Sequence, residues 1–121
     1  MTGPEHIVTM AEAVYRRRDA DAAAALFAPD AVIVWNGREV ARGDLAVLGF
    51  HQRFFAAEVA NVELSKTLIA AEGEWVAAEW RSRWDNPDGS RAHQVGAEHW
   101  RIVDGLIAEW RAYAITERED G

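Results

Sequence analysis

The 121-residue sequence contains no cysteine. The chain therefore has no disulfide scaffold, no thiolate nucleophile and no cysteine-ligated zinc, and it suits a reducing compartment, so we expect a cytoplasmic protein. Long apolar runs are also missing. The first ten residues, MTGPEHIVTM, lack the basic flank and continuous apolar stretch of a signal peptide. We expect neither a signal peptide nor a membrane anchor, and no membrane partner.

Positive charge is scarce. The chain has 13 lysines and arginines against 20 acidic residues, for a formal net charge of −7. Nucleic-acid binding usually depends on a basic surface, so this balance argues against a nucleic-acid partner. A small apolar ligand is compatible with it.

Apolar residues make up 50% of the chain, which is enough for one core without metal or disulfide support. We expect a single domain over residues 1–121. The six tryptophans are many for this length. Large aromatic side chains suit either a packed sheet or the wall of an apolar pocket.

Apolar residues spaced by three and four predict a helix over residues 4–18, opened by Pro4. A short alanine-rich helix is expected over 21–28, because Pro29 blocks its continuation. The β-branched and aromatic stretch 31–36 predicts a strand. A third helix is expected over 44–58.

Beyond residue 60 the apolar period changes to two, and three turn signals delimit strands over 61–71, 74–85, 91–103 and 106–116. Helices followed by antiparallel strands predict an α+β fold. We expect a cone-like, curved, mixed but mostly antiparallel β-sheet packed against three helices from the N-terminal half, which together enclose a pocket.

Two stretches, DADAAAALFAPDAVIVWNG and EHWRIVDGLIAEWRAY, and the order of elements make the chain resemble the nuclear transport factor 2-like superfamily in its SnoaL-like branch. Shorter stretches, VWNGREVARG, RWDNPDGS and GAEHWRI, are similar to an uncharacterised bacterial subgroup. The resemblance implies the fold. It leaves the chemistry open among polyketide cyclases, ketosteroid isomerases, epoxide hydrolases, dehydratases and non-catalytic binding modules.

The resemblance also implies site residues. Glu98 matches the protonated acid of ketosteroid isomerases, whereas Trp35 stands where they carry a general-base aspartate, and Tyr15 lies about one turn from their oxyanion tyrosine. Ala112 replaces an aspartate of the epoxide-hydrolase-like relatives. Neither complete catalytic set is present.

Alternation along the strands places Glu98 on the inner face of the sheet. Trp80, Trp84, Trp100 and Trp110 share that face, as do Leu106 and Ala108, with Ile107 outside. A β-bulge at Gly96 would exchange the two faces. A carboxyl group among indoles is held near its neutral form by desolvation and can serve as a general acid or base. Alternatively, Glu98 is a structural node bonded to a hydroxyl or an arginine.

His51 lies on the apolar side of the third helix and either relays a proton or is a satisfied core histidine. Tyr15 either donates from the first helix or packs in the core. Asn36 either contacts substrate or serves as a turn residue before a glycine. The candidate catalytic residues are Glu98, His51 and Tyr15. The candidate substrate-binding residues are Asn36, Trp35, Phe54, Phe55, Trp80, Trp84, Trp100 and Trp110.

Metal and cofactor signals are missing. His93 and His99 lie six residues apart on one strand, about 20 Å at strand rise, which is too far for one ion. The glycines form no phosphate-binding cradle. We therefore expect no metal and no cofactor.

The outer sheet face mixes aromatic residues with arginines, as protein interfaces do. We expect a homodimer through this face, with an ordinary solvated face as the alternative. Its residues are Trp75, Arg81, Arg83, His99, Arg101, Arg111 and Tyr113.

Three functional hypotheses and one further alternative remain. The first is a cofactor-independent acid–base enzyme of the cyclase or isomerase type, acting on a small apolar, polycyclic or aromatic metabolite. The second is a non-catalytic dimeric module that binds a small molecule, and an epoxide-hydrolase-like or dehydratase activity is a further alternative. The third is an interaction protein whose cavity is filled.

Overall fold

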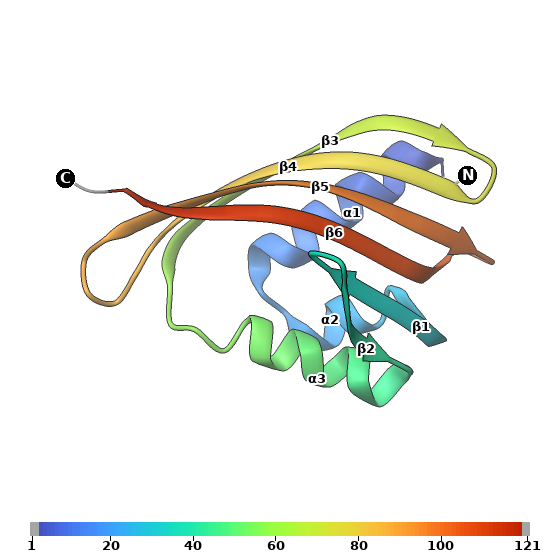
Figure 1. Ribbon diagram of the computed structural model, residues 1–121, viewed down its shortest axis with the longest axis horizontal. Coiled ribbons are helices and arrows are strands. Elements are labelled where there is room, and N and C mark those ends of the chain that lie inside the picture. Colours follow the sequence, from blue (N-terminus) through green and yellow to red (C-terminus); the bar gives the residue numbers. More distant parts are fainter. Residues whose placement is uncertain (1–2, 120–121) are drawn as a thin grey trace.

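One curved, unclosed sheet forms the frame of the molecule, in the computed structural model that describes residues 3–119. Its strand order is β2-β1-β6-β5-β4-β3. The strands are β1 (Phe27–Trp35), β2 (Arg38–Arg42), β3 (Ala60–Glu72), β4 (Trp75–Asp85), β5 (Arg91–Val103) and β6 (Leu106–Glu119). Neighbouring strands are antiparallel except β1 and β6, which are parallel. The long strands β3 to β6 arch over the helices (Figure 1).

The helices cover one side of this sheet (Figure 1). They are α1 (Pro4–Arg17), α2 (Ala20–Ala24) and α3 (Asp44–Phe54). Pro4 occupies the first turn of α1, where its missing N–H costs nothing. Arg18 ends that helix in the left-handed conformation, with φ 56°. Asp19 then caps α2 by accepting a hydrogen bond from the backbone N–H of Ala22 at 3.0 Å. Within residues 3–119, no helix combines the length and the apolar character that a membrane span requires.

The predicted α+β architecture is confirmed, with differences at the ends of elements. The third helix ends at Phe54, before residue 58, and the second ends at Ala24. Strand β1 begins at Phe27 and contains Pro29, at a point where its register with β6 shifts and a backbone donor is not needed. Strand β2, a short strand at the edge of the sheet, was not predicted from the sequence.

The predicted inner face is confirmed for the central strands, where Trp80, Trp100 and Trp110 are all buried. The start of β6 differs, because Ile107 is 3% exposed and belongs to the core. The pairing of β5 with β6 shifts between Arg101 and Ile102, so Ala108 is an extra residue in β6 and the faces exchange there. The bulge therefore lies at Ala108, and the prediction that Leu106 and Ala108 face inward with Ile107 outside was wrong.

Gly96 has a packing role of its own. It pairs across the strands with Trp80, and a Cβ atom built on it would lie 2.3 Å from the indole ring of Trp80. A glycine at this position lets the indole lie flat against the strand.

Candidate functional site

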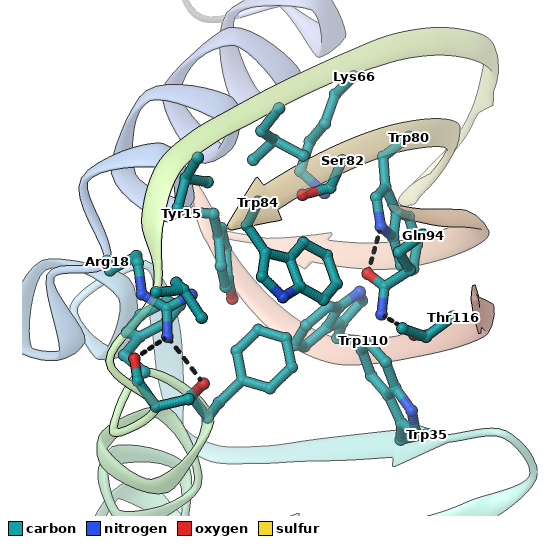
Figure 2. A pocket seen from close by; sticks show the side chains of 16 residues that line it. Tyr15, Arg18, Trp35, Lys66, Trp80, Ser82, Trp84, Gln94, Trp110 and Thr116 are labelled. Carbon is teal, nitrogen blue, oxygen red and sulfur yellow. Dashed lines mark hydrogen bonds between the residues drawn. The ribbon is translucent and has the colours of Figure 1, made fainter. Parts of the chain in front are cut away.

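An apolar cavity of about 200 Å³ opens between the sheet and the C-terminal ends of α1 and α3. Aromatic rings form most of its wall, and polar groups are few (Figure 2). The aromatic lining residues are Tyr15, Trp35, Phe54, Phe55, Trp80, Trp84 and Trp110. The charged and polar lining residues are Arg18, Lys66, Ser82, Gln94 and Thr116. Such a combination of apolar wall and few polar groups is typical of small-molecule sites.

Glu98 lies below the cavity floor and is 1% exposed. Its Oε1 atom accepts hydrogen bonds from the indole N–H groups of Trp100 at 3.1 Å and Trp110 at 2.9 Å. Its Oε2 atom accepts one from Nζ of Lys66 at 2.6 Å. Alanines on both neighbouring strands, Ala78 and Ala112, pair with Glu98 and leave space for these donors. Three donors, one of them the Lys66 ammonium, therefore surround this buried carboxyl group.

Lys66 presents the positive charge of this ion pair to the cavity. Strand β3 carries it with its side chain only 5% exposed. Its Nζ atom lies 4.8 Å from the ring centre of Trp80, 5.6 Å from that of Trp100 and 5.5 Å from that of Tyr15. The ring faces and the Glu98 carboxylate both attract this positive charge.

Tyr15 and His51 form a second buried pair. The phenol oxygen of Tyr15 lies 2.7 Å from Nε2 of His51, and Nδ1 of His51 lies 2.8 Å from the carbonyl oxygen of Val47. A carbonyl oxygen can only accept, so Nδ1 carries a proton and donates it. In neutral His51, Nε2 is then the acceptor, and the Tyr15 hydroxyl donates to it.

Burial controls the protonation of both members. Desolvation is the larger cause that raises the pKa of the Tyr15 phenol well above its ordinary value, and the negative charge of Glu98 adds to it. Desolvation also lowers the pKa of His51, against a smaller opposite effect from the Val47 carbonyl. Tyr15 is therefore a neutral hydroxyl near pH 7, and His51 is a neutral imidazole with an available lone pair.

Arg18 lies at the mouth of the cavity, where its left-handed backbone directs it across from α1 to the end of α3 (Figure 2). One guanidinium nitrogen, Nη2, donates to the carbonyl oxygens of Phe54 at 3.4 Å and Ala57 at 3.2 Å. The guanidinium carbon lies 5.3 Å from the ring centre of Phe55. Partial burial lowers the pKa of Arg18, which remains a cation in the neutral range.

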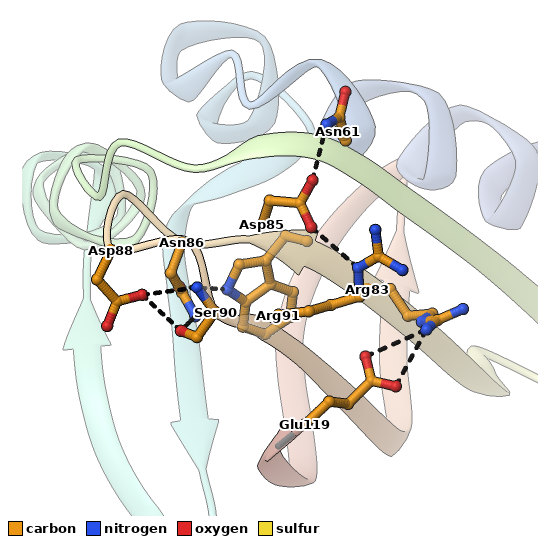
Figure 3. Close-up of polar contacts among 9 residues, drawn as sticks. Asn61, Arg83, Asp85, Asn86, Asp88, Ser90, Arg91 and Glu119 are labelled. Atoms are coloured by element: carbon orange, nitrogen blue, oxygen red, sulfur yellow. Dashed lines mark hydrogen bonds and ion pairs between the residues drawn. The ribbon is translucent and has the colours of Figure 1, made fainter. Parts of the chain in front are cut away.

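Hydrogen bonds hold two indoles of the wall in place. Trp80 donates to the Gln94 side chain at 2.8 Å, and Gln94 donates to the Thr116 hydroxyl at 2.9 Å. Trp84 donates to the side chain of Asn86 at 3.1 Å, and Asn86 donates to the Ser90 hydroxyl at 3.0 Å (Figure 3).

Ion pairs and hydrogen bonds connect β4 at this hairpin to β3, β5 and β6 (Figure 3). Asp85 accepts hydrogen bonds from Arg91 at 2.9 Å and from Asn61 at 2.7 Å. Arg83 pairs with Glu119 on β6 at 3.0 Å. The turn of this hairpin therefore has a fixed geometry beside the cavity.

Of the sequence-predicted site residues, seven line the cavity: Tyr15, Trp35, Phe54, Phe55, Trp80, Trp84 and Trp110. The other four lie elsewhere. Glu98 and Trp100 are beneath Lys66, and His51 is 0% exposed behind Tyr15. Asn36 follows β1 with φ 50°, and its side chain bonds to the backbone of Ala114 at 2.9 Å and 3.3 Å, which is the turn role.

Lys66 and Arg18 line the cavity but were not predicted from the sequence as site residues. Alternation along β3 places Leu64, Lys66 and Leu68 on one side, which matches their burial. A lone lysine between leucines on that side was the available signal. Arg18 gave no such signal, because its position depends on the left-handed end of α1.

The chain's fold recurs in solved structures. A hypothetical protein with a ketosteroid isomerase-like fold from Catenulispora acidiphila, in complex with trimethylamine, is 25% identical, with a TM-score of 0.76 over 93% of this chain and 86% of that one. IdmH from Streptomyces antibioticus, named as a candidate polyketide cyclase, is 21% identical, with a TM-score of 0.73 over 96% and 93%. SalBIII, an epoxide hydrolase/cyclase-like enzyme of pyran ring formation in salinomycin, is 23% identical, with a TM-score of 0.74 over 93% and 90%.

The search of curated proteins finds no match to this chain. The family model for the SnoaL-like domain matches residues 7–110, which run from within α1 to Trp110 in β6. The match includes the Lys66–Glu98 and Tyr15–His51 pairs. By this match, the chain belongs to the SnoaL-like domain family.

Proposed function

We propose that the protein is a cofactor-independent acid–base enzyme of the cyclase or isomerase type, acting on a small apolar ring compound that carries a carbonyl group. One observation carries the proposal. Lys66 and Tyr15 both line the apolar cavity, and each has a buried partner behind it, Glu98 and His51 respectively. The pairs supply a fixed positive charge and a proton acceptor within one cavity.

The proposed step is ring closure by a hydroxyl of the substrate on an unsaturated carbonyl of the same molecule. The hydroxyl oxygen forms the new C–O bond, and its proton passes to the Tyr15 oxygen as the Tyr15 proton passes to Nε2 of His51. The electron pair of the C=C bond moves through the conjugated system to the carbonyl oxygen, where Lys66 stabilises the enolate. The proton then returns through Tyr15 to the α carbon, so the reaction is an isomerisation.

Glu98 acts in this account as a positioning residue. Both of its oxygens already accept hydrogen bonds from the protein, three in all, so Glu98 does not contact the substrate. Its contact with Nζ of Lys66 holds the ammonium in place beside the cavity. The Tyr15–His51 pair takes the acid–base role, and the aromatic side chains of the cavity wall hold the substrate. The pyran-forming role in the name of SalBIII and the cyclase name of IdmH agree with this class of reaction.

The test is the cyclisation of o-hydroxyphenyl propenyl ketone to a methylchromanone, followed by absorbance and NMR. The protein should accelerate the reaction over buffer, and Lys66→Met and Tyr15→Phe should each lose about 100-fold or more of the acceleration. Arg17→Gln is the matched control, because Arg17 is exposed on α1 and should keep full activity. Saturable binding without acceleration contradicts the enzyme proposal.

A non-catalytic binding module is the second candidate. No carboxylate among the described residues lines the cavity, and Trp35 and Ala112 stand where relatives are expected to carry catalytic aspartates. A similar structure is a computationally designed binder of 17-OHP, which agrees with a purely binding role for this fold. The cyclisation assay separates the candidates, since the module binds the ketone and leaves its rate unchanged.

An amine ligand, as in the trimethylamine complex of the Catenulispora acidiphila protein, suits this cavity poorly. The ammonium of Lys66 already lies against the rings of Tyr15, Trp80 and Trp100. The ring faces that would bind a ligand cation are therefore already in contact with a cation of the protein.

We also propose that two copies associate through the outer sheet face. Trp75, Tyr113 and Ile115 are 41%, 45% and 64% exposed there, on β4 and β6. Sedimentation velocity should show a dimer that Tyr113→Glu dissociates. A monomer at all concentrations contradicts this proposal.

A further inference from the structure

The cavity's charges point to the chemical class of its ligand, and this inference rests on the proposed function. Among the described residues, the cavity lining contains two cations, Arg18 and Lys66, and no aspartate or glutamate. The chain as a whole has 20 acids against 13 bases, so this lining has the opposite charge balance to the protein. The Glu98 carboxylate beneath Lys66 balances one of the two charges, so one net positive charge is left to favour an anionic ligand.

The two cations differ in how their charges are balanced. Lys66 has Glu98 at 2.6 Å, so its charge is already paired inside the protein. Arg18 has no carboxylate within 4.0 Å among residues 3–119, and its contacts are two backbone carbonyls and the Phe55 ring. Both hydrogen bonds come from Nη2. The guanidinium therefore keeps further donors and an uncompensated charge at the cavity mouth.

The backbone conformation of Arg18 determines where its side chain lies. Arg18 adopts a left-handed conformation, with φ 56°, which costs a non-glycine residue free energy that the surrounding structure must supply. The Phe54 and Ala57 carbonyls then fix the guanidinium against the rim of the cavity that Phe55 forms. Figure 2 shows Arg18 on the opposite side of Tyr15 from Lys66. The mouth and the floor thus each hold one cation.

The volume of the cavity limits how large a part of the ligand can be buried. An engineered apolar cavity of about 150 Å³ holds one benzene ring. A cavity of about 200 Å³ with an open mouth accordingly takes one or two fused rings. A larger polycyclic ligand would extend past Arg18 into solvent.

We propose that the ligand is an organic carboxylate: a mono- or bicyclic apolar ring system whose carboxylate binds Arg18 at the mouth. Its ring lies among the indoles, and its reactive oxygen lies against Lys66. Arg18 is thereby a specificity-determining residue. The planar guanidinium matches a carboxylate through two parallel N–H groups, which a lysine at this position does not reproduce.

The test compares β-naphthoate with β-naphthamide, which have the same ring and nearly the same shape but differ in charge. Isothermal titration calorimetry on the full chain should give about tenfold tighter binding or better for the acid. Arg18→Gln should remove that preference and leave the affinity for the amide within about twofold. Arg18→Lys should recover only part of it. Arg17→Gln, one residue away and exposed, is the matched control and should keep the preference.

Salt provides a second readout. Binding of the acid should weaken as sodium chloride rises, while binding of the amide should not. Equal affinities for the two probes, or a parallel loss of both in Arg18→Gln, overturn the carboxylate inference and leave the proposed enzyme standing. Failure of both probes to bind the wild-type protein overturns this inference, while the cyclisation assay decides the proposed function separately.

Discussion

Nζ of Lys66 and Oε2 of Glu98 lie 2.6 Å apart directly beneath an apolar cavity, with side chains 5% and 0% exposed. A buried ion pair is a weak source of net stability, because each charge loses its hydration. Removing one partner, in contrast, leaves the other charge buried and alone. The pair therefore makes the fold sensitive to either residue and holds one ammonium at a defined place.

Lys66→Met should lower the free energy of unfolding by about 3–5 kcal/mol, because it leaves Glu98 buried without its counter-charge. Urea unfolding followed by tryptophan fluorescence measures the change. The double variant Lys66→Met with Glu98→Gln should be more stable than Lys66→Met alone, yet equally inactive. The exposed pair of Arg42 with Glu39 is the control, where Glu39→Gln should leave stability near wild type. A double variant as unstable as the single one would mean that charge isolation is not the cause.

The Tyr15–His51 pair predicts how stability depends on pH. Burial lowers the pKa of folded His51 below the value of about 6.5 that it has when unfolded. The unfolded chain then binds more protons than the folded one as pH falls below about 6.5, so the folded state loses stability below that pH and keeps it above. Urea titrations across this window should show the loss in the wild type and a smaller loss in His51→Gln, which can still bond to Tyr15 and Val47.

His6→Gln is the control for that experiment, since His6 is exposed on α1. It should retain the wild-type pH dependence. Identical curves for the wild type and His51→Gln would show that His51 is not held neutral by burial.

Features of the fold that depend on one segment of the sequence could be predicted, and features that depend on pairing between distant segments could not. Period-two alternation around Glu98 depends on one strand alone, and it correctly placed that residue among Trp80, Trp100 and Trp110. Strand β2 escaped prediction because it is short and lies at the sheet edge with four of five residues exposed. The bulge at Ala108 depends on the register with β5, which no single strand encodes.

The candidate site was harder to predict for the same reason. Glu98 was expected to have a hydroxyl or an arginine as its structural partner, but the partner is Lys66, 32 residues away on β3. That pairing requires β3, β4 and β5 in their observed order. The role of Arg18 requires the left-handed end of α1 and the position of α3 together.

The Trp84–Asn86 hydrogen bond predicts a role for the β4–β5 hairpin in ligand affinity. Asn86→Ala should raise the dissociation constant of a cavity ligand by about two- to tenfold, because the Trp84 indole loses its only hydrogen-bond partner within residues 3–119. Fluorescence titration measures it. Asn61→Ala is the control, as the Asn61 side chain donates its hydrogen bond to Asp85 in the same cluster and not to an indole partner. Equal effects of the two substitutions would indicate loosening of the whole hairpin.

The contact of Gly96 with Trp80 predicts a steric cost. Gly96→Ala should lower stability by about 1–3 kcal/mol, because the new methyl group overlaps the indole ring. In a Trp80→Leu background the same substitution should cost less, since the smaller side chain leaves room. Thermal unfolding of the four proteins completes the cycle. A cost independent of residue 80 would place the effect in the backbone.

The most direct test of the account is the ionisation of β-naphthol bound in the cavity, followed by the absorbance of its phenolate. If the Lys66 ammonium stabilises negative charge on a ligand oxygen, naphthol bound to the wild-type protein should ionise at a lower pH than naphthol bound to Lys66→Met, by about one pH unit or more. The naphthol should still bind to Lys66→Met. A bound naphthol that ionises at the same pH in both proteins, or at a lower pH in Lys66→Met, would contradict the role of Lys66.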